Sequence, residues 1–276
     1  MAPNEKKDDI EALIADIFQS KKYRDIGICE DTVRDLIATE LGRHKKRGEG
    51  VKAVRKKLHQ VIALYLGDPD YAKAINELEI AVQPANPDRL KESCRRIMSA
   101  HATTRERLPI LADFYRQIFE VTGKPGALLD IACGLNPLSF PWMNLPTAIH
   151  YYAYDIHQKR VNFLNQFFSL LGLLPLAKFQ DVLTHFPEER ADVAFIFKEV
   201  HRFERRRQGC TLPLLDALRV RHLIISFPTK SLSGRRDLAG HYHQLFYDMV
   251  KSRSWPVTEI EFEDELIFCI DKKTHR

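Results

Sequence analysis

Three aspartates lie in or directly after short apolar segments in the second half of the chain. Asp130 lies in ALLDIAC, Asp155 follows YAY, and Asp181 follows AKFQ. If these segments are neighbouring strands, a carboxylate after the second can accept hydrogen bonds from both ribose hydroxyls, and one after the third from an adenine amino group. A lone aspartate at a strand end is equally typical of a turn or a cap. The three together predict a site for an adenosine.

The loop after the first of these segments, CGLNPLSF, carries the single glycine Gly134. Dinucleotide-binding loops have two or three glycines so that the pyrophosphate can approach the backbone, and the sequence has no G-x-x-x-x-G-K-[ST] phosphate loop. Gly134 still allows the loop to approach a ligand closely. S-adenosylmethionine contains an adenosine without phosphates. These residues therefore predict it as the cofactor and disfavour a nicotinamide dehydrogenase.

The elements that must position these residues are short strands alternating with helices. Six apolar segments from residue 127 onward are typical of strands buried on both faces of a sheet. They are ALLDIAC, IHYYAYDI, AKFQDV, DVAFIFK, RHLIISF and ELIFCID. Residues 158–171 and 209–218 are long enough for crossover helices, which predicts an α/β fold with a doubly wound, mostly parallel sheet. Ligands of such sheets bind at the carboxyl ends of the strands.

The chain before these strands has the periodicity of amphipathic helices. Apolar residues recur at intervals of three and four within residues 10–18, 33–37 and 51–65. The later segment QPANPDR contains two prolines that end helices, so the domain joint is expected at residues 84–87. We therefore expect an N-terminal helical-bundle domain at residues 1–86 and a second domain at residues 87–276.

The composition predicts a folded cytoplasmic protein. With 45% hydrophobic residues among 276, the chain can bury a core. Its five cysteines are scattered and include no C-x-x-C pair, which argues against disulfides and a zinc site, and Cys133 is expected to be a buried structural thiol. The N-terminal segment MAPNEKKDDIEALIADIFQS is neither a secretion signal nor a membrane span. We therefore expect no metal ion and no membrane contact.

Basic charge is concentrated between residues 41 and 60. That stretch has eight lysines and arginines against the single acid Glu49, although the formal net charge of the whole chain is only +5. On a helix, Lys52, Arg55 and Lys56 share a face away from the apolar stripe. Such a run is often only a solvated surface, and it is also what a polyanionic partner requires.

Four segments together resemble the aminoglycoside-resistance 16S rRNA methyltransferases, which modify N7 of guanosine 1405. The segments are HATTRERL at residues 101–108, DIACGLNPL at 130–138, IFK at 196–198 and SFPTKSLSGR at 226–235. The resemblance spans nearly the whole chain, and VRKKLH at 54–59 resembles that family's rRNA-binding domain. It implies a Rossmann-like class I S-adenosylmethionine-dependent methyltransferase domain after the joint and an rRNA-binding helical domain before it.

The resemblance also assigns individual residues. Arg107 matches the arginine that holds the methionine carboxylate of the cofactor, and Lys198 and Lys230 match lysines at the mouth of the target pocket, the expected catalytic residues. The expected cofactor-binding residues are Tyr65, His101, Ala102, Thr103, Arg107, Ala132, Gly134, Asp155, Ile156, Asp181, Val182 and Phe197. The expected rRNA-binding residues are Arg43, Lys45, Lys46, Arg47, Lys52, Arg55, Lys56 and His59. Further arginines are expected to extend this surface around the pocket: Arg202, Arg205, Arg206, Arg207, Arg235 and Arg236.

The implied reaction agrees with the absence of an obvious His/Asp or Cys/His pair in the sequence. Guanine N7 carries a lone pair and no proton, so alignment of donor and acceptor is sufficient and no general base is needed. Lys198 and Lys230 are then hydrogen-bond donors to guanine O6 or to phosphates. The major groove of A-form RNA is too deep and narrow for an active site, so the target base must be flipped out.

The expected partner is 16S rRNA in the assembled 30S subunit, and the protein is expected to be a monomer that confers aminoglycoside resistance. Two alternatives stay open. One is a methyltransferase for another position in a structured RNA, and the other is a non-catalytic rRNA-binding protein that has kept the fold.

Overall fold

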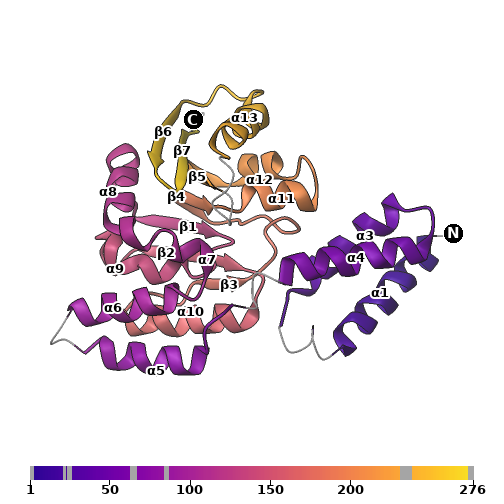
Figure 1. Cartoon of the computed structure of the whole chain (residues 1–276), viewed down its shortest axis with the longest axis horizontal. Helices are drawn as coiled ribbons and strands as arrows, with labels where there is room; N and C mark the ends of the chain where they lie inside the picture. The colour runs from indigo at the N-terminus through magenta and orange to yellow at the C-terminus, as the bar shows by residue number, and fades with distance from the viewer. Residues whose placement is uncertain are drawn as a thin grey trace.

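The structure is a computed structural model that describes residues 3–20, 23, 27–62, 67–83, 87–230 and 238–272. Helices α1, α3 and α4 form a lobe beside a sheet that carries helices on both faces (Figure 1). Within the described ranges, no helix is long and apolar enough to cross a membrane.

The sheet has seven described strands in the order β3-β2-β1-β4-β5-β7-β6. The first five strands of this order are parallel, whereas β7 is antiparallel to both β5 and β6. The strands are β1 (Ala127–Ile131), β2 (His150–Asp155), β3 (Ala177–Phe179), β4 (Arg190–Phe197), β5 (Arg219–Pro228), β6 (Val257–Phe262) and β7 (Glu265–Asp271). The predicted mostly parallel α/β sheet is confirmed, and all six predicted strands belong to it.

Successive residues of the central strands pack against different helices, which explains their continuous apolarity. In β1, Leu128 belongs to the core that includes residues of α5, α6, α8 and α10, and Leu129 to the core that includes residues of α11, α12 and α13. These helices are α5 (Tyr71–Ala81), α6 (Pro87–Met98), α8 (Leu111–Thr122), α10 (Gln158–Leu170), α11 (Val200–Arg206), α12 (Thr211–Ala217) and α13 (Ala239–Val250). Short turns complete the chain: α7 (Ala102–Arg105), η2 (Leu108–Ile110), η3 (Asn136–Ser139) and α9 (Phe140–Met143).

The N-terminal lobe has a hydrophobic core of its own, formed by α1 (Pro3–Gln19), α3 (Glu30–Arg43) and α4 (Arg47–Ile62). The predicted apolar stripes supply this core, as in Ile17, Leu36 and Val54. Helix α5 instead contributes to the core of the sheet. The change of core therefore falls between α4 and α5, ahead of the boundary expected at residue 86, and the expected joint at residues 84–87 lies mostly outside the described residues.

All five cysteines lie in the described ranges, and each is buried and free of disulfide bonds. Burial raises the pKa of the Cys133 thiol well above its usual value. Cys133 is therefore the buried thiol that its place beside apolar residues predicts.

Candidate functional site

The carboxyl ends of β1, β2, β3 and β4 bring most of the expected cofactor residues to one edge of the sheet. Ile131 is in register with Tyr154, and Asp155 with Phe179, so these strands end side by side. Ala132 follows β1, and Lys198 follows β4 on the other side of β1. This edge is where ligands of doubly wound sheets bind.

The backbone turns sharply at the ends of two adjacent strands. Ala132 after β1 has a φ of 52° and Lys198 after β4 has a φ of 57°, and Gly134 in the same loop as Ala132 has a φ of 56°. The left-handed region costs a residue with a side chain about 1–3 kcal/mol, and such residues cluster at ligand sites. The strain at Ala132 and Lys198 thus supports a functional role for this edge.

Asp155 is buried, and three protein donors fix its carboxylate. Its Oδ2 atom accepts hydrogen bonds from the Gly134 amide at 3.1 Å and from Arg160 Nη1 at 2.9 Å. Its Oδ1 atom accepts from the His157 amide at 2.9 Å. A carboxylate has about four acceptor positions, so Asp155 retains capacity for a ligand hydroxyl. Arg160 also pairs with Asp68, which connects this carboxylate to the segment that precedes α5.

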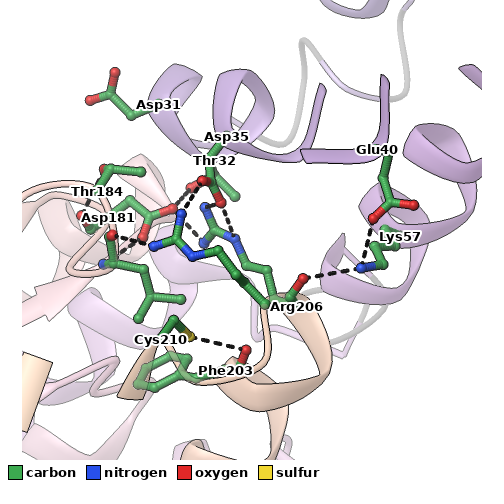
Figure 2. A network of polar contacts seen from close by, with 12 residues as sticks. Asp31, Thr32, Asp35, Glu40, Lys57, Asp181, Thr184, Phe203, Arg206 and Cys210 are labelled. Atoms are coloured by element: carbon green, nitrogen blue, oxygen red, sulfur yellow. Dashed lines mark hydrogen bonds and ion pairs between the residues drawn. The ribbon is translucent and has the colours of Figure 1, made fainter. Parts of the chain in front are cut away.

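Asp181 is also buried, and its partners come from three parts of the chain (Figure 2). Its Oδ1 atom accepts from the Leu183 amide at 2.9 Å. Its Oδ2 atom accepts from Thr32 Oγ1 and from Arg206 Nη1, both at 2.6 Å. Thr32 belongs to α3 of the lobe and Arg206 to α11. The sequence interpretation missed Thr32, which is 149 residues away from Asp181 along the chain, and it placed Arg206 on the exposed surface around the pocket.

Asp130 does not join the carboxylates at the strand ends and instead lies in a buried polar cluster. It accepts hydrogen bonds from Asn136 Nδ2 at 2.9 Å and from the Tyr151 hydroxyl at 2.7 Å. Burial raises the pKa of Asp130 to about 7. Asp130 therefore supports the loop after β1 through Asn136.

Arg107 is 2% exposed and is held by a buried carboxylate. Its Nε atom donates to Glu265 Oε2 at 3.1 Å, and its Nη1 atom donates to Asn136 Oδ1 at 2.8 Å. Its guanidinium carbon lies 4.4 Å from the ring centroids of both Phe114 and Phe197. A guanidinium has five N–H donors, so these contacts do not prevent it from binding the carboxylate of a cofactor.

The two expected catalytic lysines contact different carboxylates. Lys198 is 2% exposed, and its Nζ atom lies 2.7 Å from Glu106 Oε2 and 3.4 Å from Glu265 Oε2. Lys230 is exposed, and it pairs with Glu263 and Asp264 in the turn between β6 and β7. Lys198 is therefore a buried, paired cation, whereas Lys230 is a surface residue.

The remaining expected cofactor residues are distributed around this edge. His101 is buried and its Nδ1 atom lies 2.9 Å from Thr103 Oγ1, while burial lowers the pKa of His101 to about 4 and keeps the ring neutral at pH 7. Val182 and Phe197 are buried, Ile156 is half-buried, and Ala102 begins α7. Tyr65 lies outside the described residues.

All eight expected rRNA-binding side chains are exposed along the C-terminal end of α3, the following turn and α4. Lys57, between two of them, is half-buried and binds Glu40 Oε1 at 2.9 Å and the Arg206 carbonyl at 3.0 Å. The prediction for Arg206 is wrong, because its side chain is only 10% exposed and binds Asp35 and Asp181 instead of facing solvent. Arg235 and Arg236 lie outside the described residues.

Comparisons with known proteins extend over nearly the whole chain. The model of the family described as Ribosomal RNA methyltransferase (FmrO) matches residues 19–269. A 16S rRNA (guanine(1405)-N(7))-methyltransferase of Micromonospora echinospora is 33% identical, with 98% of each chain covered. One of the same name from Serratia marcescens is 34% identical, with 96% of this chain and 99% of the relative covered.

Solved structures show the same extent of similarity. An rRNA methylase from Escherichia coli has a TM-score of 0.76 and 30% identity, with 96% of this chain and all of that chain covered. The 16S rRNA methyltransferase RmtF in complex with S-adenosyl-L-homocysteine has a TM-score of 0.75 and 26% identity, with 95% and 97% covered. The likeness confirms the fold expected for the sheet region and includes the N-terminal lobe.

Proposed function

The chain belongs to the ribosomal RNA methyltransferase (FmrO) family, and from this membership we propose that it methylates N7 of guanosine 1405 in 16S rRNA. The protein is an S-adenosylmethionine-dependent enzyme. The structural observation that supports the cofactor part of this proposal is the pair of buried carboxylates, Asp155 and Asp181, which follow the adjacent strands β2 and β3.

These residues fit S-adenosylmethionine. The carboxylates of Asp155 and Asp181 each keep an acceptor position, which suits ribose hydroxyls and an adenine amino group respectively. The guanidinium of Arg107 would hold the methionine carboxylate, with Gly134 in the loop next to it. When bound, the cofactor supplies an electrophilic methyl group on its sulfonium. Guanine N7 needs no deprotonation, so the chain contributes alignment and water exclusion.

Lys198 is suited to hold the target base. Its ammonium has three N–H donors, and the contacts with Glu106 and Glu265 leave one for guanine O6. Burial between two carboxylates keeps this donor in a fixed place at the end of β4. We assign Lys230, which is exposed, to contact with the rRNA backbone near the pocket mouth.

The basic surface of the lobe supports recognition of folded rRNA. Its exposed lysines and arginines can bind phosphates and offset the few kcal/mol that base flipping costs. The lobe lies beside the sheet (Figure 1). We propose the assembled 30S subunit as the substrate, because recognition of folded rRNA by such a basic lobe needs an RNA surface larger than one hairpin supplies.

Methyl transfer to purified 30S subunits tests this function. Labelled S-adenosylmethionine, the full chain and 30S subunits are expected to give label at guanosine 1405, mapped by borohydride–aniline cleavage and primer extension. The Asp155→Ala variant serves as the negative control. Label at another nucleotide would support the alternative RNA target. An absence of heat with S-adenosylhomocysteine in calorimetry would leave a non-catalytic rRNA-binding protein.

Aminoglycoside resistance is the cellular consequence that we propose. Methylation adds a fixed positive charge and bulk at N7, which repels polycationic drugs that contact this nucleotide. Bacteria expressing the chain are expected to grow on kanamycin and gentamicin at concentrations that inhibit cells expressing Asp155→Ala. Equal sensitivity of the two strains would refute the resistance proposal.

A further inference from the structure

The first turn of α3 reaches the adenosine end of the proposed cofactor site. The Cys29 amide donates to the Ile156 carbonyl at 2.9 Å, and the Gln158 amide donates to the Gly27 carbonyl at 3.0 Å. The two contacts join the segment that leads into α3 to the loop after β2 and to the first residue of α10. Thr32, one turn further on, donates to Asp181 after β3. The N-terminal lobe is thus bonded to both loops that are expected to hold the adenosine.

Arg206 of α11 also connects the lobe to Asp181 (Figure 2). Its Nη1 atom binds Asp181, while its Nε and Nη2 atoms bind Asp35 Oδ2 at 2.9 and 2.7 Å. Burial alone would lower the pKa of Arg206, but the carboxylates of Asp181 and Asp35 raise it overall. One largely buried cation, 10% exposed, therefore contacts both a carboxylate of the lobe and a carboxylate of the proposed cofactor site.

These contacts determine which part of Asp181 is available to a ligand. Thr32 and Arg206 both donate to Oδ2, and the Leu183 amide takes one position on Oδ1. With three donors in place the carboxylate cannot rotate, and its remaining acceptor position is on Oδ1. Because the carboxylate is already fixed, it does not have to be ordered when a ligand binds. The binding free energy is therefore not reduced by the entropy cost of that ordering.

We propose that Thr32 and Arg206 are positioning residues for the cofactor, which orient Asp181 to accept the adenine amino group, so that the lobe completes the cofactor site. The inference rests on the proposed role of Asp181 in cofactor binding. It follows that cofactor binding and docking of the lobe stabilise each other, because a coupling between two sites is reciprocal. The lobe that we assign to rRNA then also sets the affinity for the methyl donor.

Calorimetry with S-adenosylhomocysteine tests the role of Thr32. Thr32→Val removes one donor to a carboxylate without changing shape or charge, and it is expected to weaken binding about tenfold. Thr32→Ser keeps the hydroxyl and is expected to restore wild-type affinity. In methyl transfer, Thr32→Val should raise KM for S-adenosylmethionine while kcat and KM for the 30S subunit stay close to wild type. Arg206→Met should weaken binding at least as much.

Lys57→Met is the matched control, because it removes a different contact between the lobe and α11 without touching Asp181. It is expected to lower Tm and to change affinity for S-adenosylhomocysteine much less than Thr32→Val. The inference is overturned if Thr32→Val binds S-adenosylhomocysteine as tightly as the wild-type chain or more tightly. It is also overturned if Lys57→Met loses as much affinity as Thr32→Val. Failure of the wild-type chain to bind S-adenosylhomocysteine would instead refute the proposed cofactor.

Hydrogen exchange of the wild-type chain provides a test that does not depend on any variant. S-adenosylhomocysteine is expected to slow amide exchange in residues 29–35, at the start of α3, as well as in the loops after β2 and β3. Protection of the loops with unchanged exchange in residues 29–35 would contradict the coupling between cofactor and lobe.

Discussion

At the scale of single residues, the three aspartates of the strand segments differ in the cations that accompany them. Asp155 pairs with Arg160 at 2.9 Å and Asp181 with Arg206 at 2.6 Å. Asp130 accepts only from neutral groups in the described contacts, those of Asn136 and Tyr151. Burial without a directly bonded cation favours the neutral form, which is why the pKa of Asp130 is raised to about 7.

This difference predicts how stability depends on pH. The folded pKa of Asp130 exceeds its usual value of 3.8, so the folded state binds the extra proton between about pH 4 and pH 7. The contribution of Asp130 to stability is therefore largest below pH 4 and falls as pH rises towards 7. Asp130→Asn mimics the neutral carboxyl and should avoid this loss, which amounts to at most roughly 4 kcal/mol. Melting temperatures of the two proteins that change in parallel from pH 4 to pH 7 would contradict the prediction.

The two lysines that we propose for binding the target RNA are expected to behave differently on substitution. Lys198→Met removes a buried donor at the reacting edge, and kcat for methyl transfer should fall by about 100-fold, the effect typical of removing an electrostatic donor from an active site. Glu265 keeps its contacts with Arg107, so affinity for S-adenosylhomocysteine should change little. Lys230→Met removes an exposed charge and should mainly raise KM for the 30S subunit. Equal effects of both variants on kcat would show that burial does not distinguish them.

At the scale of elements, the central strands could be predicted because they are buried on both faces and therefore read as continuous apolar runs. Strand β6 was missed, because its sequence VTEIEF has a single buried residue, Ile260, at the edge of the sheet. The strand-end positions of Asp155 and Asp181 followed from the same apolar runs. Their partners Arg160 and Arg206 did not, because a basic residue in a helix looks the same whether it faces solvent or a buried carboxylate.

Helices α3, α4 and α11 meet at Lys57, which gives a prediction for stability. Glu40 of α3 is 4% exposed, and Lys57 of α4 binds both Glu40 and the carbonyl of Arg206 near the end of α11. Lys57→Met should lower the free energy of unfolding by roughly 2 kcal/mol. This loss is smaller than that for breaking a fully buried ion pair, because Arg43 still contacts Glu40. The exposed neighbour Lys56 is the control, and Lys56→Met should change it by less than about 0.5 kcal/mol. Urea denaturation of both variants measures the difference, and equal values would refute the role of Lys57.

At the scale of the whole molecule, the lobe lies beside the carboxyl edge of the sheet, and two of its surfaces differ in what they contact. The start of α3 is hydrogen-bonded to the loops after β2 and β3, through the Cys29 amide and the Thr32 hydroxyl respectively. Its exposed basic side chains lie along the end of α3 and along α4. This arrangement puts the proposed rRNA surface and the contacts with the proposed cofactor loops on one helical lobe.

The basic face makes a prediction about salt. Lys52, Arg55 and Lys56 are exposed on one face of α4, and their replacement by alanine removes up to three ionic interactions with phosphates. The slope of log K for 30S binding against log salt concentration should become shallower by about one for each phosphate that is no longer neutralised. Affinity for S-adenosylhomocysteine should stay unchanged, since none of these side chains contacts Asp155 or Asp181.

A second triple variant separates a local effect from a change in overall charge. Lys73, Arg89 and Lys251 are exposed and lie outside the lobe, so their replacement by alanine removes the same charge from other surfaces. Filter binding to 30S subunits compares the two variants. The salt concentration is varied from about 50 to 300 mM, a range in which phosphate contacts dominate the salt dependence. If the rRNA surface is on the lobe, only the α4 variant has a shallower slope. The same slope in both variants would mean that the net positive charge of the chain determines the salt dependence. The assignment of the lobe as the rRNA-binding surface would then be refuted.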